Sequence, residues 1–433
     1  MRTRAVLTVL STAAIAASTT FLACGNGDDS TGPAPKPAAD ASTDGSLSDG
    51  SSLDAGATGD AKAADAGDGG ETAAELKHVY VIMMENHAQK QIIGDTTDAP
   101  NLNALAQKYG TATNYYGVTH PSLPNYLAAV SGDFQGIFDD CNAGPDLTCP
   151  VEEFVLNSGD GTENQLMTAA QAANAATIPH WFTGRTIVDQ LEEHGLTWEA
   201  YMGSLPATGD VSTGFPATVP VPPADAGDEA GTDVGNLYAQ KHNPFMYFPS
   251  IRTNANRMQR IVPITELASD LAKPTAPNFV WISPDQCADM HGIHADTAAF
   301  IDAGFCGTAA AGNDMDPNVI KYGDAYVGGL VKTIMATPSW SEGSAIVIVF
   351  DEDDYVGTSG CCNSPTGVDG GTLGGALVPA IVISSLVAAA TTSADPYNHY
   401  SLLATLQHIW GLDCLANTCG MTGSSLMTKL FVP

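Results

Sequence analysis

The chain of 433 residues carries 48 Asp and Glu against 16 Lys and Arg, which gives a formal net charge of −32 at pH 7. Such a charge argues against nucleic acid as a binding partner, because its phosphates would be repelled. It does not exclude an anionic substrate, since a bound cation can reverse the local charge. The apolar content is sufficient for the core of one large domain or two ordinary ones.

Residues 1–24 are predicted to be an export signal. Two arginines precede an apolar stretch that is too short, and too rich in Ala, Ser and Thr, to span a membrane. The following "FLAC" resembles a bacterial lipobox, which would make Cys24 the lipidated first residue of a lipoprotein in the bacterial cell envelope. Phe21 is unusual at the first lipobox position, so cleavage and secretion is the alternative. A lipid on Cys24 is the only membrane association that we expect.

Residues 25–76 are predicted to be a disordered acidic linker, because they contain almost no large apolar residue whose burial could offset the entropy of ordering. The folded domain is predicted to span 77–433. Within it, the segment 216–235 repeats the composition of the linker. We expect an exposed loop there rather than a domain boundary.

Several short, continuous apolar runs are typical of buried parallel strands. They lie within 79–84, 278–285, 344–354 and 376–384. A helix is predicted over 99–110, with Asn101 as its N-cap and Gly110 as its stop, and a second helix over 186–195 runs into another strand. An amphipathic helix at 398–412 is expected to close the chain. Strands that alternate with helices predict an α/β fold around a mostly parallel sheet.

Apart from Cys24, the exported part holds eight cysteines, an even number that predicts disulfides. Cys141 with Cys149, and Cys414 with Cys419, are close enough in sequence to close local loops. The other four are expected to pair among themselves in an unknown order: Cys287, Cys306, Cys361 and Cys362. A zinc cluster is the alternative for these four, although their spacing fits no zinc finger or ribbon.

Polar side chains gather directly after three of the predicted strands, at the end where open α/β sheets bind ligands. The three groups are Glu85, Asn86 and His87; Asp351, Glu352, Asp353 and Asp354; and Asp285, Asp289, His291 and His294. Carboxylates and imidazoles that converge in this way would repel one another or lose hydration unless a cation neutralised them. Mixed oxygen and nitrogen ligands suit a divalent metal ion, and they do not identify which one.

Each of these residues also has an ordinary structural interpretation. Acidic residues at strand ends are commonly helix caps or solvated turns, and single histidines near helix ends are commonly hydrogen-bonded structural residues. His194 and His408, on predicted helices, are assigned to that second class. Three strand ends carry residue types that ligate metal ions. This coincidence favours a functional site for the other residues of the three groups.

Seven segments occur along the chain in a characteristic order: "MMENH", "HPSLPNYLAAVSG", "TIVDQLEEHGLTWEAYM", "KHNPFMYF", "SPDQCADMHG", "FDEDD" and "NHYSLLATLQHIWGL". Together they resemble the phosphoesterase family of bacterial and fungal acid phosphatases and phospholipases C, in the alkaline phosphatase superfamily. The resemblance extends over about 77–420. It implies an alkaline-phosphatase-like three-layer αβα sandwich with a central, mostly parallel sheet, and metal-assisted phosphoryl transfer through a covalent phospho-enzyme.

Carried over by position, the resemblance assigns Glu85 and Asn86 to a first pair of metal ligands. It assigns Asp351 and Glu352 to a second, acidic pair for the same divalent metal ion. His291 matches the histidine of the mid-chain motif, for which it implies a catalytic role.

Two further histidines are implied to lie near the substrate phosphate. His242, in "KHNPF", matches one of them. His399 matches another, in a motif that often reads Asp-His before "SLL" and here reads Asn398-His399. His399 keeps the histidine of the motif, whereas Asn398 replaces its aspartate. This amide casts doubt on any second metal ion that would rely on a carboxylate there.

The segment "HPSLPN" is implied to hold the nucleophile. Related nucleotide pyrophosphatases carry a threonine directly before "F-P-N", and Ser122 precedes "LPN" at the same offset. The flanking prolines restrict the backbone, so that the hydroxyl can be held in line. His120 is expected to orient the hydroxyl or protonate the leaving group. Thr119 is the rival nucleophile, and Asn125 is either a donor to the phosphate or a helix cap.

The predicted function is therefore a metal-dependent phosphoric ester hydrolase, a phosphomonoesterase similar to acid phosphatases that acts through a phosphoserine intermediate. The alternatives are a phospholipase C-type phosphodiesterase on lipid head groups and a surface lipoprotein that keeps the fold for binding only. The expected partner is a phosphate ester substrate.

Overall fold

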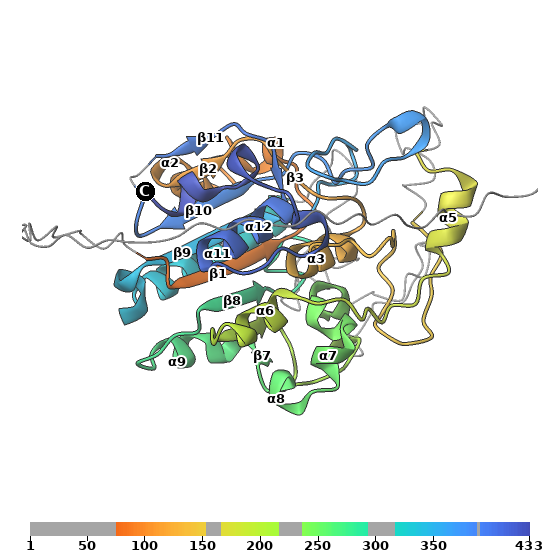
Figure 1. Ribbon diagram of the computed structural model, residues 1–433. Coiled ribbons are helices and arrows are strands. Elements are labelled where there is room, and N and C mark those ends of the chain that lie inside the picture. The colour runs from red at the N-terminus through yellow and green to blue at the C-terminus, as the bar shows by residue number, and fades with distance from the viewer. Residues whose placement is uncertain (1–74, 153–165, 216–235, 293–316, 388–389) are drawn as a thin grey trace, which may run out of the picture. The chain divides into compact units, whose positions relative to one another are not determined.

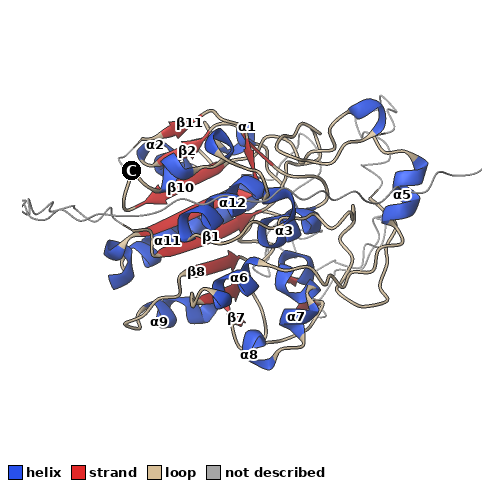
Figure 2. Cartoon of the chain, viewed as in Figure 1, coloured by secondary structure: helices blue, strands red, loops and turns tan. Residues whose placement is uncertain are grey.

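An eight-stranded sheet forms the centre of the computed structural model (Figures 1 and 2). Its strands, in spatial order, are β11 (Thr392–Ser393), β2 (Gly110–Ala112), β10 (Ala380–Ser384), β9 (Ser344–Phe350), β1 (His78–Met84), β8 (Phe279–Ser283), β4 (Trp198–Met202) and β7 (Ile261–Pro263). The five strands from β9 to β7 run parallel, and β10 is antiparallel to both of its neighbours. The predicted α/β fold with a mostly parallel central sheet is confirmed.

The structure describes residues 75–152, 166–215, 236–292, 317–387 and 390–433, and the chain from Gly70 onward forms one compact unit. The predicted signal peptide with Cys24 lies outside the described residues, as do most of the linker 25–76, the loop 216–235, His294 and Cys306. Leu76, at the end of the predicted linker, is buried in the core.

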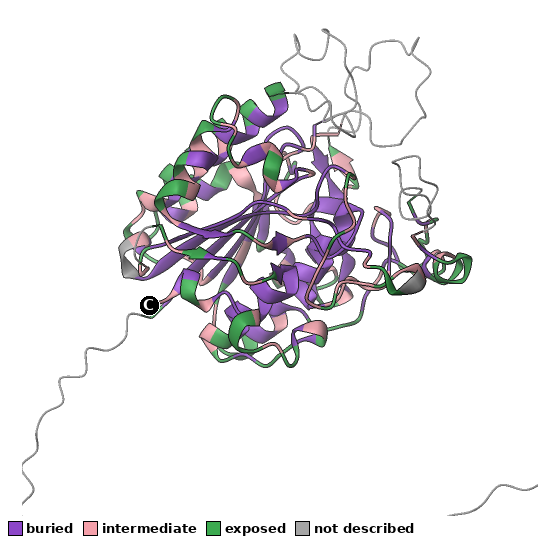
Figure 3. Cartoon of the chain, turned by 90° about the horizontal axis from the view of Figure 1, so that it is seen from above, coloured by how far each residue is buried: buried purple, intermediate pink, exposed green. Residues whose placement is uncertain are grey.

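Helices cover both faces of the sheet, as Figure 3 shows. One group of helices makes contacts among α2 (Pro100–Lys108), α9 (Leu267–Leu271) and α11 (Pro317–Met335), and the other among α3 (Ser122–Ser131), α6 (Ile187–Glu193) and α12 (His399–Trp410). The shorter helices are α1 (Gln89–Ile92), α5 (Ala169–Ala175), α7 (Pro249–Arg252), α8 (Ala255–Met258) and α13 (Thr428–Phe431). The three-layer arrangement predicted from the resemblance is therefore present.

Two small sheets lie outside the central sheet, and two of the 3-10 turns follow one of them. β3 (Tyr115–Tyr116) pairs in parallel with β12 (Tyr397–Asn398), and β5 (Gly214–Phe215) pairs antiparallel with β6 (Tyr238–Ala239). The 3-10 turns η1 (Gln240–His242) and η2 (Pro244–Tyr247) follow β6 directly. The β3–β12 pair brings the start of α12 next to the segment that leads into α3.

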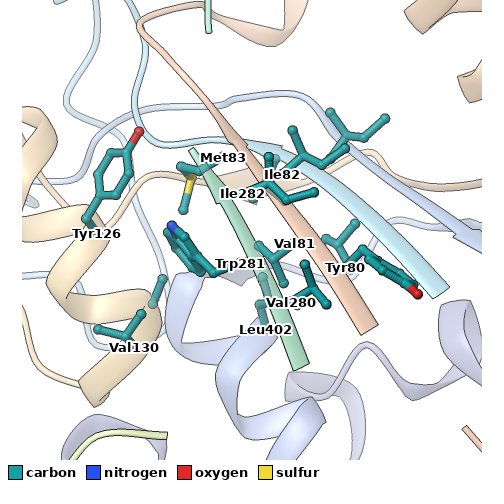
Figure 4. Close-up of a cluster of buried hydrophobic side chains, with 14 of the residues drawn as sticks. Tyr80, Val81, Ile82, Met83, Tyr126, Val130, Val280, Trp281, Ile282 and Leu402 are labelled. Carbon is teal, nitrogen blue, oxygen red and sulfur yellow. The ribbon is translucent and has the colours of Figure 1, made fainter. Parts of the chain in front are cut away.

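The central strands are uninterrupted apolar runs because they lie in the core. All seven residues of β1 and all seven of β9 are buried, because each strand has another strand on both sides and a helix layer on both faces. Figure 4 shows side chains of β1 and β8 packed together, with Leu402 of α12 and Tyr126 of α3 beside them. Each large apolar side chain buried in this way contributes about 1.5 to 3 kcal/mol.

The start of α2 differs from the prediction. The N-cap is Ala99 and Asn101 is the second helical residue, so Asn101 as N-cap was wrong. The cap is supplied by Asp324 of α11, whose carboxylate accepts hydrogen bonds from the backbone N–H groups of Asn101 (3.0 Å) and Leu102 (2.7 Å). A carboxylate satisfies the free N–H groups of a helix start and interacts favourably with its dipole.

The helix does end ahead of Gly110, as predicted, but for a different reason. Gly110 begins β2, and a Cβ atom there would lie 2.8 Å from the carbonyl oxygen of Val382 in the neighbouring strand. The glycine is therefore required by the close approach of two strands.

The late helix also differs from its prediction. α12 lies within the predicted range, but its residues 399–407 are all buried, so it is not an amphipathic surface helix. It is also not the last helix, because α13 follows it. None of the described helices combines the length and the apolar character that a bilayer-spanning helix requires.

The disulfides Cys141–Cys149 and Cys414–Cys419 are present as predicted. Of the other four cysteines, Cys361 is bonded to its neighbour Cys362, and Cys287 is also disulfide-bonded. The zinc-cluster alternative is therefore wrong for these three cysteines.

We expect Asp324→Ala to lower the free energy of unfolding by about 2 to 4 kcal/mol, because it leaves buried N–H groups at the start of α2 without an acceptor. Urea unfolding followed by circular dichroism measures the change. The matched control is Lys321→Gln in the same helix, which removes an exposed ion pair to Asp98 and should cost less than about 1 kcal/mol. Equal effects of the two substitutions would contradict the proposed cap.

Candidate active site

The carboxyl ends of β1 and β9 bring the first two groups of predicted site residues together. Asn86 donates its backbone N–H to Asp351 Oδ1 (3.1 Å), and Asp351 donates its own to the carbonyl oxygen of Met84 (3.0 Å). Glu85 donates its backbone N–H to the carbonyl oxygen of Asp289, in the segment that follows β8 (2.9 Å). Because β8, β1 and β9 are adjacent parallel strands, their carboxyl ends meet at one edge.

Ser122 is the first residue of α3, and its hydroxyl is fully buried between two carboxylates. Its Oγ lies 2.9 Å from Glu85 Oε2 and 3.3 Å from Glu352 Oε1. Either oxygen can therefore accept the hydroxyl proton, which is the requirement for an activated nucleophile.

The rival nucleophile Thr119 is placed differently. Its hydroxyl donates to the carbonyl oxygen of His120 (3.4 Å), and no carboxylate of the described residues accepts a hydrogen bond from it. Asn125 fixes the turn that carries both hydroxyls. Its Oδ1 accepts from the N–H groups of Val118 and Thr119, and its Nδ2 donates to the carbonyl oxygens of Thr119 and Pro121. Asn125 therefore holds the backbone of the turn before α3. We had expected it to donate to the phosphate or to cap a helix.

His120 contacts Glu352, one of the two carboxylates beside Ser122. Its Nδ1 contacts Glu352 Oε2, and its Nε2 lies 2.8 Å from the carbonyl oxygen of Gly357. The ring also stacks on Tyr355, with centroids 5.0 Å apart. Burial lowers the pKa of His120, while Asp353 acts in the opposite direction. In this arrangement His120 orients Glu352 rather than the hydroxyl itself.

The second oxygen of Glu85 is held by Tyr126 and His242. The Tyr126 hydroxyl donates to Glu85 Oε1, and His242 Nε2 lies 3.3 Å from the same oxygen. His242 Nδ1 lies 3.1 Å from Asp289 Oδ2, and its ring stacks on Tyr126 at 5.3 Å. Burial lowers the pKa of His242 well below its usual value, and the nearby charges of Lys241 and His291 lower it further. The neutral ring lies between the carboxyl groups of Glu85 and Asp289.

His291 lies at the partly exposed side of this group. It donates its backbone N–H to Asp289 Oδ1 (2.8 Å), and its Nδ1 lies 2.8 Å from the carbonyl oxygen of Gly292. Its Nε2 lies 3.2 Å from Lys241 Nζ. Lys241 also pairs with Asp140 at 2.8 Å.

His399 supports the backbone of Asp351. Its Nε2 lies 2.7 Å from the carbonyl oxygen of Asp351, and its Nδ1 lies 3.0 Å from the Tyr115 hydroxyl. Burial lowers the pKa of His399 to about 4, so the ring is neutral. Both ring nitrogens are used inside the protein, which places His399 behind the site and not at the substrate. Asn398 caps α12, with Oδ1 accepting from Tyr400 N (3.0 Å).

The buried carboxyl groups resist ionisation in the absence of a cation. Burial raises the pKa of Glu85 well above its usual range, and the charges of Asp351 and Asp289 add to the shift. Burial likewise raises the pKa of Glu352 and of Asp289 well above their usual ranges, and that of Asp351 to about 6. A divalent cation among these groups would offset both effects.

The donor atoms fit such a cation. Asn86 Oδ1 and Asp351 Oδ2 are buried and have no hydrogen-bond partner in the structure. Together with Glu85 and Glu352 they form an all-oxygen set that suits a hard divalent ion. A second possible set shares one of these residues: ligand atoms of Glu85, His242 and His291 lie within 4.8 Å of one another.

The sequence of residues 95–413 matches the model of the phosphoesterase family. The chain belongs to the phosphoesterase family. It is 26% identical over 327 residues to an acid phosphatase of Aspergillus fumigatus, a match that covers 75% of this chain and 54% of that protein. It is 24% identical over 337 residues to a phosphatidylinositol-3-phosphatase of Mycobacterium tuberculosis, covering 77% of each. The chain thus spans between half and two thirds of the length of the first fungal relatives it matches.

Among solved structures, this phosphoesterase is similar to a protein in the alkaline phosphatase superfamily from Vibrio parahaemolyticus. The TM-score is 0.42 and the sequence identity is 13%, and the match covers 80% of this chain and 69% of that one.

Three residues of the phosphoesterase site, Tyr126, Lys241 and Asp140, were not among the predicted ones, and a fourth, Asp289, had been singled out without a role. Tyr126 lies four residues after Ser122, so one helical turn places it on the same face. Asp289 belonged to the polar group after β8 but received no role. Lys241 directly precedes His242, and Asp140 directly precedes a disulfide cysteine.

We expect Asp351→Asn to stabilise the metal-free protein at pH 7.5 by about 2 to 3 kcal/mol. The pKa of Asp351 is about 6 in the folded state, against 3.8 as its ordinary value, so the folded state binds the proton more tightly. Stability is therefore lost as the pH rises from about 4 to 6, and an amide removes that loss. The difference between variant and wild type should vanish near pH 4.

Thermal unfolding at several pH values, after dialysis against a chelator, measures this difference. Added divalent metal should raise the melting temperature of the wild type more than that of the variant. The control is Asp146→Asn, an exposed carboxylate. A destabilised Asp351→Asn protein at pH 7.5 would contradict the proposed cost of burying this charge.

Proposed function

We propose that this phosphoesterase hydrolyses phosphate monoesters, as acid phosphatases do, with Ser122 as the nucleophile. The observation that carries the proposal is the buried Ser122 hydroxyl, placed between Glu85 and Glu352 at the edge of a parallel sheet. The fungal acid phosphatases and the mycobacterial phosphatidylinositol-3-phosphatase among its relatives support a phosphate ester as substrate.

Metal dependence is part of the proposal. Glu85, Asn86, Asp351 and Glu352 would hold a divalent ion, which would neutralise phosphate oxygens and favour ionisation of the nearby hydroxyl. The two buried oxygen atoms without a hydrogen-bond partner, Asn86 Oδ1 and Asp351 Oδ2, support this set of ligands.

Two residues of the chain then carry out the proton transfers. Glu85 takes the proton of Ser122 as Oγ forms a bond to phosphorus, while the bond from phosphorus to the ester oxygen breaks. His291, which is only partly buried, gives a proton to the departing alcohol. In the second step, water breaks the Oγ–P bond, His291 takes back a proton from that water, and Glu85 returns its proton to Ser122.

His120 is less suited to the leaving group than His291 is. His120 is fully buried and contacts Glu352 and the carbonyl of Gly357, whereas His291 is only partly buried. We therefore assign His120 to the positioning of Glu352.

Export to the cell envelope, with Cys24 as a lipidated N-terminus, completes the proposal. The disulfides of the folded domain support an oxidising environment.

We expect Ser122→Ala to lower the turnover of p-nitrophenyl phosphate at least about a thousandfold, because the covalent step loses its nucleophile. Acid-quenched wild-type enzyme should carry a phosphate group on the peptide that contains Ser122, which mass spectrometry detects. A chelator should abolish turnover, and added divalent metal should restore it.

Thr119→Val is the matched control, because it removes the neighbouring hydroxyl and keeps the shape of the side chain. Activity that survives Ser122→Ala but is lost in Thr119→Val would transfer the nucleophile to Thr119. No phosphate release by the wild type with divalent metals supplied would refute the proposed hydrolase.

A further inference from the structure

Lys241 is a well-covered basic residue beside the site. Among the residues that the structure describes, it is the only Lys or Arg buried as a whole residue, although the Arg257 side chain, in a peripheral ion pair, is 13% exposed against 10% for Lys241. The others are at least partly exposed, as in the peripheral ion pairs of Lys321 with Asp98 and of Lys429 with Asp395. A buried ammonium costs hydration energy, so a partner or a ligand must offset that cost.

The ammonium is held between the nucleophile helix and the partly exposed histidine. Its Nζ lies 2.8 Å from Asp140 Oδ2, and Asp140 Oδ1 accepts the backbone N–H of Leu123, the residue after Ser122 (2.9 Å). On the other side, Nζ lies 3.2 Å from His291 Nε2. The carboxylate of Asp140 therefore fixes the lysine relative to the start of α3.

The rest of the site is rich in negative charge. Ser122 lies against Glu85 and Glu352, and Asp289 and Asp351 are close by. His291, whose Nε2 lies 3.2 Å from Lys241 Nζ, donates its backbone N–H to Asp289 Oδ1. The ammonium of Lys241 therefore lies beside this acidic group.

Phosphate monoesters and diesters differ in the charge that such a site must accept. Above pH 7 a monoester carries two negative charges and a diester carries one. A compact, strongly charged ammonium compensates the additional charge without the planar geometry that a guanidinium requires.

We propose that Lys241, positioned by Asp140, binds the second negative charge of a phosphate monoester dianion and so selects monoesters over diesters. This inference rests on the proposed function and assigns a substrate class to the same site. It also gives Asp140 a role as a positioning residue, since Asp140 touches the lysine and the helix start but no reacting atom.

The test compares kcat/KM for p-nitrophenyl phosphate and for bis(p-nitrophenyl) phosphate at pH 8, using full-length protein with divalent metal supplied. In Lys241→Gln the ratio of the two values should fall about a hundredfold, because only the dianion loses a charged partner. Lys241→Arg should restore part of the ratio, since it keeps the charge. Lys429→Gln, which removes an exposed lysine from an ion pair, is the matched control and should leave the ratio unchanged.

Equal losses for both substrates in Lys241→Gln, with an unchanged melting temperature, would overturn the proposal and leave the lysine a structural role. Wild-type protein that hydrolyses neither substrate would refute the proposed function instead. In that case calorimetric binding at pH 8 still tests Lys241: orthophosphate should bind the wild type about a hundredfold more tightly than Lys241→Gln, whereas dimethyl phosphate should not distinguish them. Equal orthophosphate affinities would overturn the inference.

Discussion

The burial of several carboxylates around one hydroxyl is the constraint on which the rest of the site depends. Glu85 and Glu352 both approach Ser122, and both are removed from water. Buried charges of like sign are costly unless each has a partner. The neighbouring groups supply such partners: Tyr126 and His242 contact Glu85, and His120 contacts Glu352. The contacts that pack this region are therefore the same contacts that position the carboxyl groups around Ser122.

Buried polar side chains hold the backbone beneath these groups. Asn125 uses its whole amide on the turn before α3, and His399 fixes the carbonyl of Asp351. The resemblance had implied that His399 lies near the phosphate, and Asn125 had been expected either as a donor to the phosphate or as a helix cap. The structure shows instead that a site with fixed carboxylates needs fixed peptide groups, and that buried amides and neutral imidazoles provide them.

Some of this organisation could be predicted from the sequence and some could not. The strands β1, β8 and β9 are continuous apolar runs that end in polar residues, so their burial and the location of the site followed from local pattern. Contacts between segments that are distant in the sequence produce no such local pattern. The cap of α2 by Asp324 and the pairing of Lys241 with Asp140 join segments that only the tertiary fold brings together.

The position of β1 in the sheet has a consequence for how the chain is made. β1 is the first strand in the described part of the chain, yet it lies between β8, whose pairing begins at Phe279, and β9, whose pairing begins at Ser344. An apolar strand with both edges open is a site for association with other chains. The nascent polypeptide must therefore keep both edges of this apolar strand protected until β9 has been translated.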